Sequence, residues 1–447
     1  MRAEEGWFRP QPFVVCAVLW LVLVFPSLAA ASTPAVPRQN TQSGAGRLES
    51  ITVTGSTRFR SGQVALATRL TIGQTVTRND IQQAADRLAQ LGPFTNVQYH
   101  FSTAEGGVKI EYQVTDAPVL PVLFDNFPWL ADQELISGLR TSVPLFDGTA
   151  PEHGTILDDM SITLEELLSK RGVNAHVTHD VVIGSGGVQR LVQFRVEGAD
   201  VIIEAVEFSD ALAKSDRGIQ DRLSDLIGKP FSRTTIELFE LEQVRPVYLA
   251  HAFLRVQFGP AGARFAGNAN SVSPNRVVVT VPIDPGPRFT WGSVTWSGNA
   301  AIPSTVLNGL VDLKTDESAD GMKINATWER VRAAFSQRGY LDVNLTPVPQ
   351  FDDVAKRVAY AVSITEGQQY HMGELVLTGL SLEGERRIRA AWSIAQGAVF
   401  NEGVYEEFLD SGIKRALAGL PVHYEKIGRF LQKDSKTGKV DVLLDFQ

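Results

Sequence analysis

The stretch Phe289–Gly298, FTWGSVTWSG, aligns without a gap with Tyr370–Gly379, YHMGELVLTG. In each copy an aromatic residue is followed three positions later by a glycine, then by alternating residues and a closing glycine. Pro285-Gly286 precedes the first copy, and Glu366-Gly367 precedes the second. The alternation predicts a β-strand, and its recurrence after roughly 80 residues is typical of a chain built from repeated modules.

Two more strands of this kind occur earlier in the chain. Leu48–Gly55 repeats the strand together with its glycine, and Val201–Phe208 repeats the strand without it. The repetition therefore extends well beyond the two clearest copies.

A second landmark is a helix that ends at a glycine and leads into an alternating strand. In the first unit Thr77 and Asp80 have the spacing of a capping box, and Gly92-Pro93 is a helix stop signal. The apolar residues between them have helical spacing: Ile81, Ala84, Ala85, Leu88 and Leu91. The next stretch alternates apolar with polar residues: Val97, Tyr99 and Phe101 with Gln98, His100 and Ser102. This strand is predicted to bury one face.

The later units repeat this order. Thr155 with Asp158 is predicted to open a helix that ends near Arg171-Gly172, and Arg338-Gly339 ends another. The strands predicted after the helices contain Val173, Ala175 and Val177 in the second unit, Leu254, Val256 and Phe258 in the third, Leu341, Val343 and Leu345 in the fourth, and Val422–Ile427 in the fifth. A last strand closes a unit, as in Val440–Phe446. The predicted fold class is α+β, a tandem array of about five β-α-α-β-β modules, each a three-stranded sheet covered by two helices.

This order resembles the POTRA domain, and two stretches carry the likeness: Leu91-Gly-Pro-Phe-Thr-Asn-Val97 and Arg338-Gly-Tyr-Leu-Asp-Val343. The expected units are 48–117, 118–198, 199–286, 287–367 and 368–447. The second has a divergent first strand around Val119–Phe124, and the fifth has a weak middle.

Five such units resemble the periplasmic half of BamA-type outer-membrane assembly factors. In that family a transmembrane β-barrel follows the last unit, whereas this sequence ends at Gln447, directly after its last predicted strand. This departure removes any direct expectation that the chain folds or inserts membrane proteins by itself. A separately encoded outer-membrane β-barrel protein is a candidate partner.

The first residues are typical of an export signal. Arg2 and Arg9 precede an apolar run, Phe13–Leu28, and small residues follow at Ala29–Ala31. We expect a signal peptide at 1–31, cleaved on export, and a flexible linker at 32–47 that is rich in Ser, Thr, Pro, Gln and Gly. An uncleaved membrane anchor is the alternative. The expected location is the periplasm, in association with the outer membrane and with at most peripheral contact with the bilayer.

Composition and motifs argue against several function classes. The net charge of −8 at pH 7 does not fit a nucleic-acid-binding surface. His176 and His179 would face opposite sides of a strand and have no neighbouring ligand motif, so surface histidines are expected. Gly184–Gly187 has neither a P-loop lysine nor a following helix. We expect no enzymatic activity, no cofactor and no metal.

The remaining hypothesis is polypeptide binding. In the family, the strand after the helices lies at the edge of the sheet, where unpaired N–H and C=O groups can pair with an extended client. The candidate residues are Val97, Gln98, Tyr99, His100, Asn174, Ala175, His176, Arg255, Val256, Asp342, Val343 and Asn344. The expected partners are unfolded outer-membrane or secreted proteins. The alternative is a structural spacer or docking arm that binds no client.

Overall fold

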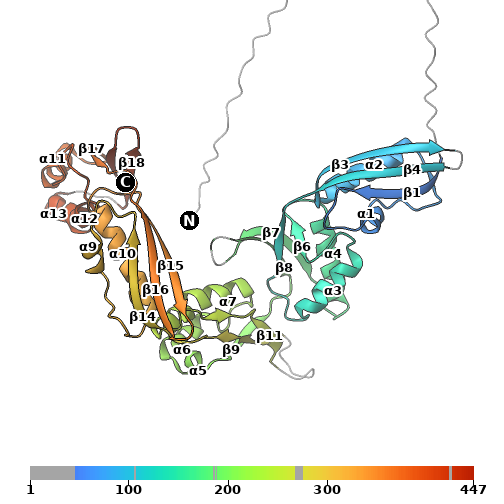
Figure 1. The fold of residues 1–447 in the computed structure, drawn as a ribbon, viewed down its shortest axis with the longest axis horizontal. Helices are drawn as coiled ribbons and strands as arrows, with labels where there is room; N and C mark the ends of the chain where they lie inside the picture. Colours follow the sequence, from blue (N-terminus) through green and yellow to red (C-terminus); the bar gives the residue numbers. More distant parts are fainter. Residues whose placement is uncertain (1–45, 105–106, 185–186, 188, 267–274, 422–424) are drawn as a thin grey trace, which may run out of the picture.

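The computed structural model describes residues 46–104, 107–184, 187, 189–266, 275–421 and 425–447. Within them, five modules follow one another along a curved path, with the first and fifth at opposite ends (Figure 1). The predicted signal peptide lies outside the described residues. Gly46 and Arg47, which were expected in the linker, belong to the first strand.

Module 1 has the order β1 (Gly46–Thr54), α1 (Ser61–Ala67), β2 (Thr75–Val76), α2 (Arg78–Leu91), β3 (Phe94–Ala104) and β4 (Gly107–Asp116). Its sheet has the order β2-β1-β4-β3, with β4 parallel to β1 and antiparallel to β3. The last strand of the module in sequence, β4, thus lies inside the sheet, between β1 and β3. This order leaves β3 at one edge.

Local sequence explains the helix that precedes this edge. The Thr77 side chain accepts a hydrogen bond from the Asp80 amide, and the Asp80 carboxylate accepts one from the Thr77 amide, which completes the predicted capping box. The helix ends at Gly92, whose φ of 102° lies in the left-handed region. The predicted apolar face of α2 is buried against the sheet.

The other four modules are variants of this plan. Module 2 comprises β5 (Val119–Phe124), α3 (Asp132–Ser142), β6 (Thr149–Pro151), α4 (Ile156–Ser169), β7 (His176–Ile183) and β8 (Arg190–Glu197). Module 3 comprises β9 (Ile202–Phe208), α5 (Ala211–Ser215), α6 (Arg217–Arg222), the 3-10 turn η1 (Leu223–Asp225), α7 (Arg233–Phe239), the π-helical turn η2 (Glu240–Val244), α8 (Arg245–Ala250), β10 (Gln257–Phe258), β11 (Gly262–Phe265), β12 (Arg276–Val281) and β13 (Ile283–Asp284).

Module 4 comprises β14 (Thr290–Ser297), α9 (Ser304–Asn308), α10 (Gly321–Ser336), β15 (Asn344–Asp352) and β16 (Arg357–Thr365). Module 5 comprises β17 (His371–Thr378), α11 (Leu382–Ala391), α12 (Glu402–Glu407), the π-helical turn η3 (Phe408–Gly412), α13 (Ile413–Leu417), β18 (Ile427–Asp434) and β19 (Lys439–Phe446). The predicted class, a tandem α+β array with the helices on one face of each sheet, is confirmed.

Several predicted strand boundaries are wrong, for one physical reason. Six candidate residues lie in turns or irregular segments before the strands: Asn174, Ala175, Arg255, Val256, Asp342 and Val343. Each helix ends in a residue with positive φ: Gly172, Ala252 or Gly339. The next residue donates its amide to the carbonyl five positions earlier, as Tyr340 does to Phe335. The chain needs several residues to leave this cap, so the strands begin later.

Two further expectations also need correction. In module 5 the strand after the helices is Ile427–Asp434 rather than Val422–Ile427, and residues 422–424 lie outside the described part of the chain. Thr155 does precede α4, but its side chain makes no capping hydrogen bond, because its backbone already has helical φ and ψ. The helix start was therefore predicted correctly from the wrong interaction.

The first strand of every module is covered at its beginning by the segment between the helices. In modules 1 and 2 this segment forms β2 and β6, which pair with β1 and β5. In the other modules it forms single bridges, Ile202 to Pro230, Thr290 to Ser318 and His371 to Val399. No inter-helix segment among the described residues pairs with the opposite edge. Among the described helices, none combines the length and the hydropathy that crossing a bilayer would require.

Candidate peptide-binding edges and the joints between modules

The strand after the helices lies at an edge of the sheet in modules 1, 2, 4 and 5, as β3, β7, β15 and β18. In module 3 this position is shared by β10, which pairs with β13, and by β11, which pairs with β12. An edge strand presents one row of backbone groups to solvent. These strands are therefore the candidate surfaces for an added client strand.

Strand β3 is the longest of these edges, with 11 residues. Val97, Tyr99 and Phe101 pack against the core, whereas Gln98 and His100 are exposed on the other face. The Tyr99 hydroxyl donates to the Gln82 side chain at 2.7 Å, which anchors β3 to α2. Of the twelve candidate residues, six lie within an edge strand: Val97 to His100 in β3, His176 in β7 and Asn344 in β15.

The equivalent position in module 2 shows which backbone groups face outward. The Val177 amide donates to the Glu165 carboxylate of α4 at 2.8 Å and so points away from the central strand β8. Val177 pairs with Val196 as Val97 pairs with Val114, and each partner is the last buried residue of the strand that closes its module. Because backbone groups alternate along a strand, Val97, Tyr99, Phe101 and Thr103 direct their amides outward.

The edge of module 2 is partly occupied by its own helix. Glu165 also contacts His176 Nδ1 at 2.6 Å, and His179 Nδ1 lies 3.1 Å from the Ser161 hydroxyl. Both histidines thus contact α4, where the sequence predicted surface residues on opposite faces. The start of β7 is less available to a client than β3.

The edge of module 4 is blocked by its sequence. Pro347 and Pro349 lie in β15, paired with Val362 and Tyr360. Proline is tolerated in an edge strand where its nitrogen faces away from the ladder, so each removes an outward donor. Asn344 is the first residue of this strand. Of its candidate residues, only Asn344 reaches the edge, and that edge is poorly suited to accept a strand.

A different set of candidate residues forms the joints between modules. The Phe289 amide at the start of module 4 donates to the Ala252 carbonyl at 3.1 Å, and the Tyr370 amide at the start of module 5 donates to the Gly339 carbonyl at 2.8 Å. Gly286 and Gly367, with φ of 64° and 75°, lie against Arg255 and Asp342. The Pro-Gly and Glu-Gly landmarks therefore mark joints of one repeated geometry.

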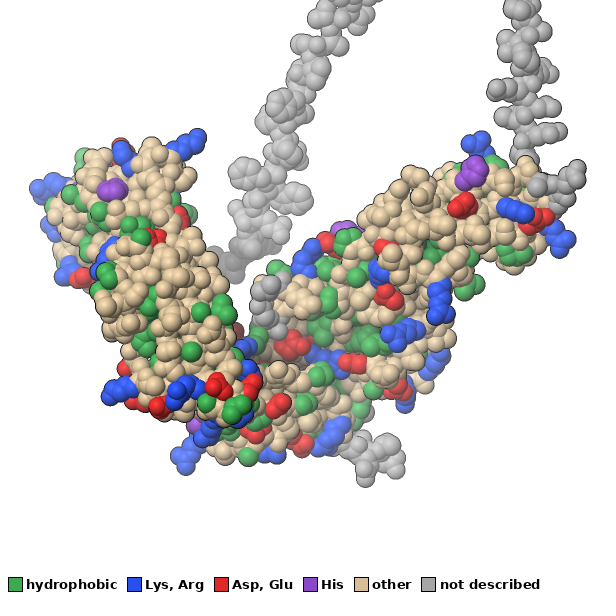
Figure 2. All heavy atoms as spheres, in the orientation of Figure 1, with side chains coloured by type: hydrophobic (Ala, Val, Ile, Leu, Met, Phe, Trp, Pro, Cys, Tyr) green, Lys and Arg blue, Asp and Glu red, His purple; other side chains and the backbone are tan. Residues whose placement is uncertain are grey.

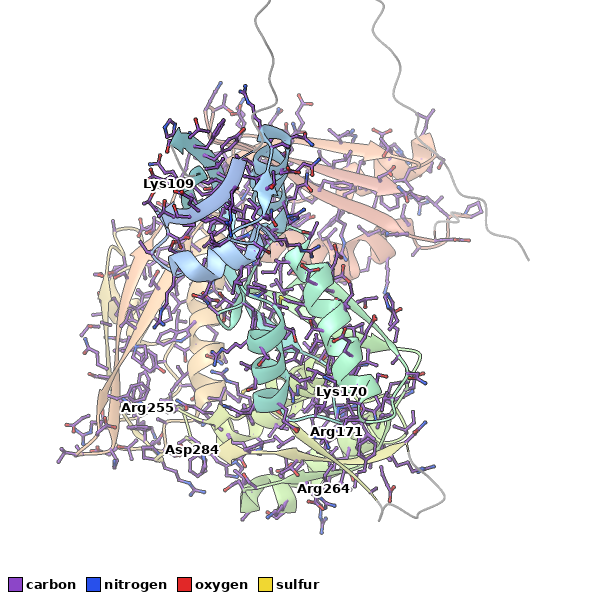
Figure 3. The ribbon with its side chains drawn as sticks, turned by 90° about the vertical axis from the view of Figure 1, so that its right-hand side faces the viewer. Lys109, Lys170, Arg171, Arg255, Arg264 and Asp284 are labelled. Carbon is purple, nitrogen blue, oxygen red and sulfur yellow. The ribbon has the colours of Figure 1, made fainter. Side chains whose placement is uncertain are left out.

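Arg255 holds the joint between modules 3 and 4. Its guanidinium lies 4.0 Å from the Phe351 ring centroid and 5.4 Å from that of Phe289, and donates to the Asp353 carboxylate at 2.8 Å. Arg255 and Asp284 lie at the same corner of module 3 (Figure 3). Arg255 thus makes cation–π contacts and an ion pair with module 4. Its side chain belongs to the joint rather than to a peptide-binding edge.

Asp342 has the equivalent place between modules 4 and 5. It accepts a hydrogen bond from the Tyr370 hydroxyl at 2.7 Å and another from Lys433. These bonds, from Lys433 first, lower the pKa of Asp342. The bond from Tyr370 raises the pKa of that phenol in turn. An arginine thus faces Phe289 in one joint, and an aspartate faces a tyrosine hydroxyl in the next.

The joint between modules 2 and 3 is built around a buried carboxylate. Asp125, which is 1% exposed, accepts hydrogen bonds at Oδ1 from the Ser232 hydroxyl and from the Thr234 amide and hydroxyl, at 2.9–3.0 Å. Its Oδ2 lies 3.5 Å from Arg195 Nε, an ion-pair distance without hydrogen-bond geometry. Module 2 therefore caps the N-terminus of α7 in module 3.

Modules 1 and 2 are joined by backbone contact. The Thr155 amide donates to the Gln90 carbonyl at 3.0 Å, and a Cβ at Gly92 would meet the His153 carbonyl at 1.9 Å. The predicted helix stop at Gly92 is thus also a site of close approach. The buried residues of these two modules form one continuous cluster.

Charges on the surface do not form a large single-sign patch on the face shown in Figure 2, where acidic and basic side chains are interspersed. Within the described residues, no group of three or more His, Cys, Asp or Glu side chains could hold a metal ion. Glu240 is 4% exposed, and burial raises its pKa to about 8. This isolated buried carboxyl was not predicted from the sequence, since only the tertiary structure buries it.

Comparison with known proteins finds a family match for one module and two distant relatives for larger parts of the chain. Residues 289–367, which make up module 4, match the POTRA family, described as a surface antigen variable number repeat. An outer membrane protein assembly factor assigned in Treponema pallidum is 21% identical over 232 residues, which cover 50% of this chain. The assembly factor BamA of Buchnera aphidicola is 18% identical over 352 residues, which cover 75% of this chain.

A solved structure of POTRA domains 3–5 of Haemophilus influenzae BamA is also similar, with 16% identity and a TM-score of 0.42. It covers 55% of this chain and 96% of its own. The matched region spans 27% of the Treponema protein and 54% of the Buchnera protein.

Proposed function

We propose that this chain, a tandem array of POTRA-type modules, is a polypeptide-docking scaffold for outer-membrane protein assembly in the bacterial envelope. Extended segments of unfolded outer-membrane or secreted proteins would pair with the free edge of β3 and, more weakly, with the other open edges. The relatives named as outer membrane assembly factors support the process, and the open edge of β3 supports the mode of binding.

The single observation that carries this proposal is that the edges differ in how many of their outward backbone groups are free to pair. Strand β3 has 11 residues without a proline, whereas β15 carries two prolines and β7 is held by Glu165 at its start. Main-chain pairing would give affinity with little sequence preference, which suits unfolded clients. Binding by β-augmentation should therefore concentrate on module 1.

Thr103→Pro tests the edge of β3. The Thr103 side chain is exposed, and its amide points away from β4. Proline at this position therefore removes one outward donor without removing a core side chain. We expect the affinity for a urea-unfolded outer-membrane protein to fall about 3- to 10-fold, because one hydrogen bond contributes roughly 0.5–1.5 kcal/mol. Fluorescence anisotropy with a labelled client measures the change.

Thr103→Ala is the matched control, because it shortens the same side chain but retains the amide. An equal affinity of the proline variant and the control, with unchanged melting temperatures, would refute pairing along this edge.

The alternative function is a structural spacer or docking arm that binds no client. The repeated joints between modules 3, 4 and 5 favour it, since they fix successive modules through the same contacts. Crosslinking from β3 in cells separates the two functions. Recovery of unfolded outer-membrane proteins supports docking, and recovery of one folded partner alone supports the spacer.

A further inference from the structure

A groove follows the first strand of module 5. Six consecutive residues of β17, Met372–Leu377, form one wall, and Arg389, Trp392 and Ile394 form the other. Its volume is about 420 Å³, within the range of small binding sites. This groove lies at the opposite edge of the sheet from β18, so it is separate from the edges considered above.

Part of the backbone of β17 faces this groove. The loop after α11 covers the start of the strand, where the Met372 amide donates to the Ala398 carbonyl at 2.8 Å. Farther along, the Leu375 carbonyl accepts a hydrogen bond from Arg389 Nη1 at 2.8 Å and so points away from β19. By alternation, Leu377 directs its N–H and C=O the same way. The outward groups of Leu377 can therefore pair with an added strand, beside the Leu375 carbonyl that Arg389 already holds.

Module 4 shows which side chain can fill the space between the first strand and the first helix. Trp296 pairs with Val362 in its sheet as Leu377 pairs with Leu444 in module 5. The indole of Trp296 is half-buried, donates to Asn308 of α9 at 2.8 Å, and packs edge-to-face on Trp328 with centroids 5.9 Å apart. It fills the space between strand and helix with an aromatic ring.

Module 5 has different residues at the two corresponding positions, and the one on the strand is smaller. Leu377 replaces the tryptophan, and Arg389 follows it at the same offset as Asn308 follows Trp296. The guanidinium of Arg389 is held by Glu385 at 2.8 Å and by the Leu375 carbonyl. The space that an indole occupies in module 4 is therefore part of an open groove in module 5.

We propose that the β17–α11 groove binds an extended polypeptide segment that carries a tryptophan. The segment adds a strand to the second half of β17, and its indole inserts between Leu377, Arg389 and Trp392 as Trp296 does within module 4. This inference rests on the proposed polypeptide-docking function, and it assigns to module 5 a preference for aromatic residues that an edge such as β3 lacks.

The test uses the full chain and two fluorescein-labelled peptides, Thr-Val-Thr-Trp-Thr-Val-Thr and the same peptide with Ala in place of Trp. We expect the Trp peptide to bind at least about tenfold more tightly. Leu377→Trp fills the groove from within and should abolish this difference. Leu382→Trp adds the same ring at the start of α11, where Leu382 is 87% exposed and outside the lining of the groove, and should preserve it.

Equal affinities for the two peptides, or an unchanged preference in Leu377→Trp with a native melting temperature, would overturn the proposal. If Leu377→Trp does not fold, amide hydrogen exchange of the wild-type chain decides: protection of residues 375–377 by the Trp peptide supports the groove, and its absence refutes it. If Thr103→Pro weakens binding of the unfolded client but the Trp peptide shows no preferential binding, only the inference about the groove is eliminated. Loss of both would eliminate the docking function as well.

Discussion

Glu240 illustrates how a single residue can depend on its surroundings more than on its type. It lies in the π-helical turn η2 of module 3, and its Oε1 has no hydrogen-bond partner. Burial, followed by the nearby charge of Glu237, raises its pKa from 4.5 to about 8. The carboxyl is therefore protonated in the fold at neutral pH, whereas in the unfolded chain it is ionised.

This difference predicts a pH dependence of stability. A raised carboxyl pKa has no effect below about pH 4.5, lowers the free energy of unfolding as pH rises to about 8, and has a constant effect above. After allowance for solvent screening the loss should be about 2–4 kcal/mol. Glu240→Gln should remove it, as measured by urea unfolding at pH 5, 7 and 8.5.

Glu242→Gln, at an exposed position of the same turn, is the control and should leave the pH profile unchanged. Parallel profiles for the wild type and Glu240→Gln would show that burial of this carboxyl does not govern the stability of module 3.

Ala252 shows a second effect at the residue scale. It adopts a φ of 64° where the equivalent residues are Gly172 and Gly339. A side chain is strained in this conformation, yet its amide donates to the Leu249 carbonyl at 3.0 Å and its carbonyl accepts from Phe289. The cap and the joint together maintain a backbone conformation that the local sequence does not favour.

At the scale of elements, the five edges differ through a few residues rather than through topology. Strands β3 and β15 occupy the same place in their sheets, but Pro347 and Pro349 remove outward donors from β15. Prolines on an edge also discourage unwanted pairing between sheets. The array therefore combines an open edge at one end with a protected edge near the other.

Restoring the donors should open the edge of module 4. The double variant Pro347→Thr and Pro349→Val regains two outward amides, so hydrogen exchange should show β15 protected by an unfolded client. Loss of proline should cost roughly 0.4–1 kcal/mol of stability per site through the unfolded chain. The affinity of the whole chain should rise about 3-fold or more.

Val348 lies on the same strand, but its amide points toward β16 rather than outward. Val348→Thr therefore serves as the control. If an unfolded client protects β15 in neither variant while the fold is intact, the missing donors are not what keeps clients from this edge.

At the scale of the whole molecule, the joints decide whether the modules act as one body. Modules 1 and 2 share a continuous cluster of buried residues, and Asp125 ties module 2 to the helix α7 of module 3. The ion pairs of the joints at Arg255 and Asp342 are more exposed than Asp125, and they add to one inter-module backbone hydrogen bond in each joint. We therefore expect the first three modules to move together and the last two to be more mobile.

Asp125→Ala tests the buried joint. The change leaves the Thr234 amide and Arg195 without their carboxylate, which should cost about 2–4 kcal/mol. Modules 2 and 3 should then separate more freely, which small-angle X-ray scattering would record as a wider distribution of dimensions and proteolysis as faster cleavage between the modules.

Asp353→Ala removes an exposed ion pair from the joint between modules 3 and 4 and should cost less than about 1 kcal/mol. If both variants behave alike, the buried carboxylate has no special role in holding the array together.

The sequence by itself determined the repeated order of elements. Alternation, helical spacing and the glycines at 92, 298, 339 and 379 predicted modules in which helices cover one side of a sheet, because these signals act over a few neighbouring residues. The position of β3 at an edge followed from the family resemblance and agrees with the structure.

Only the tertiary structure decided which residues face a client and which face the next module. Arg255 and Asp342 looked like edge residues, yet they hold joints to Phe351 and Tyr370, far away along the chain. The open β17 groove likewise depends on the absence of a ring that Trp296 supplies in module 4. Local patterns specify strands and helices, whereas burial, pairing partners and cavities arise from contacts between segments distant in sequence.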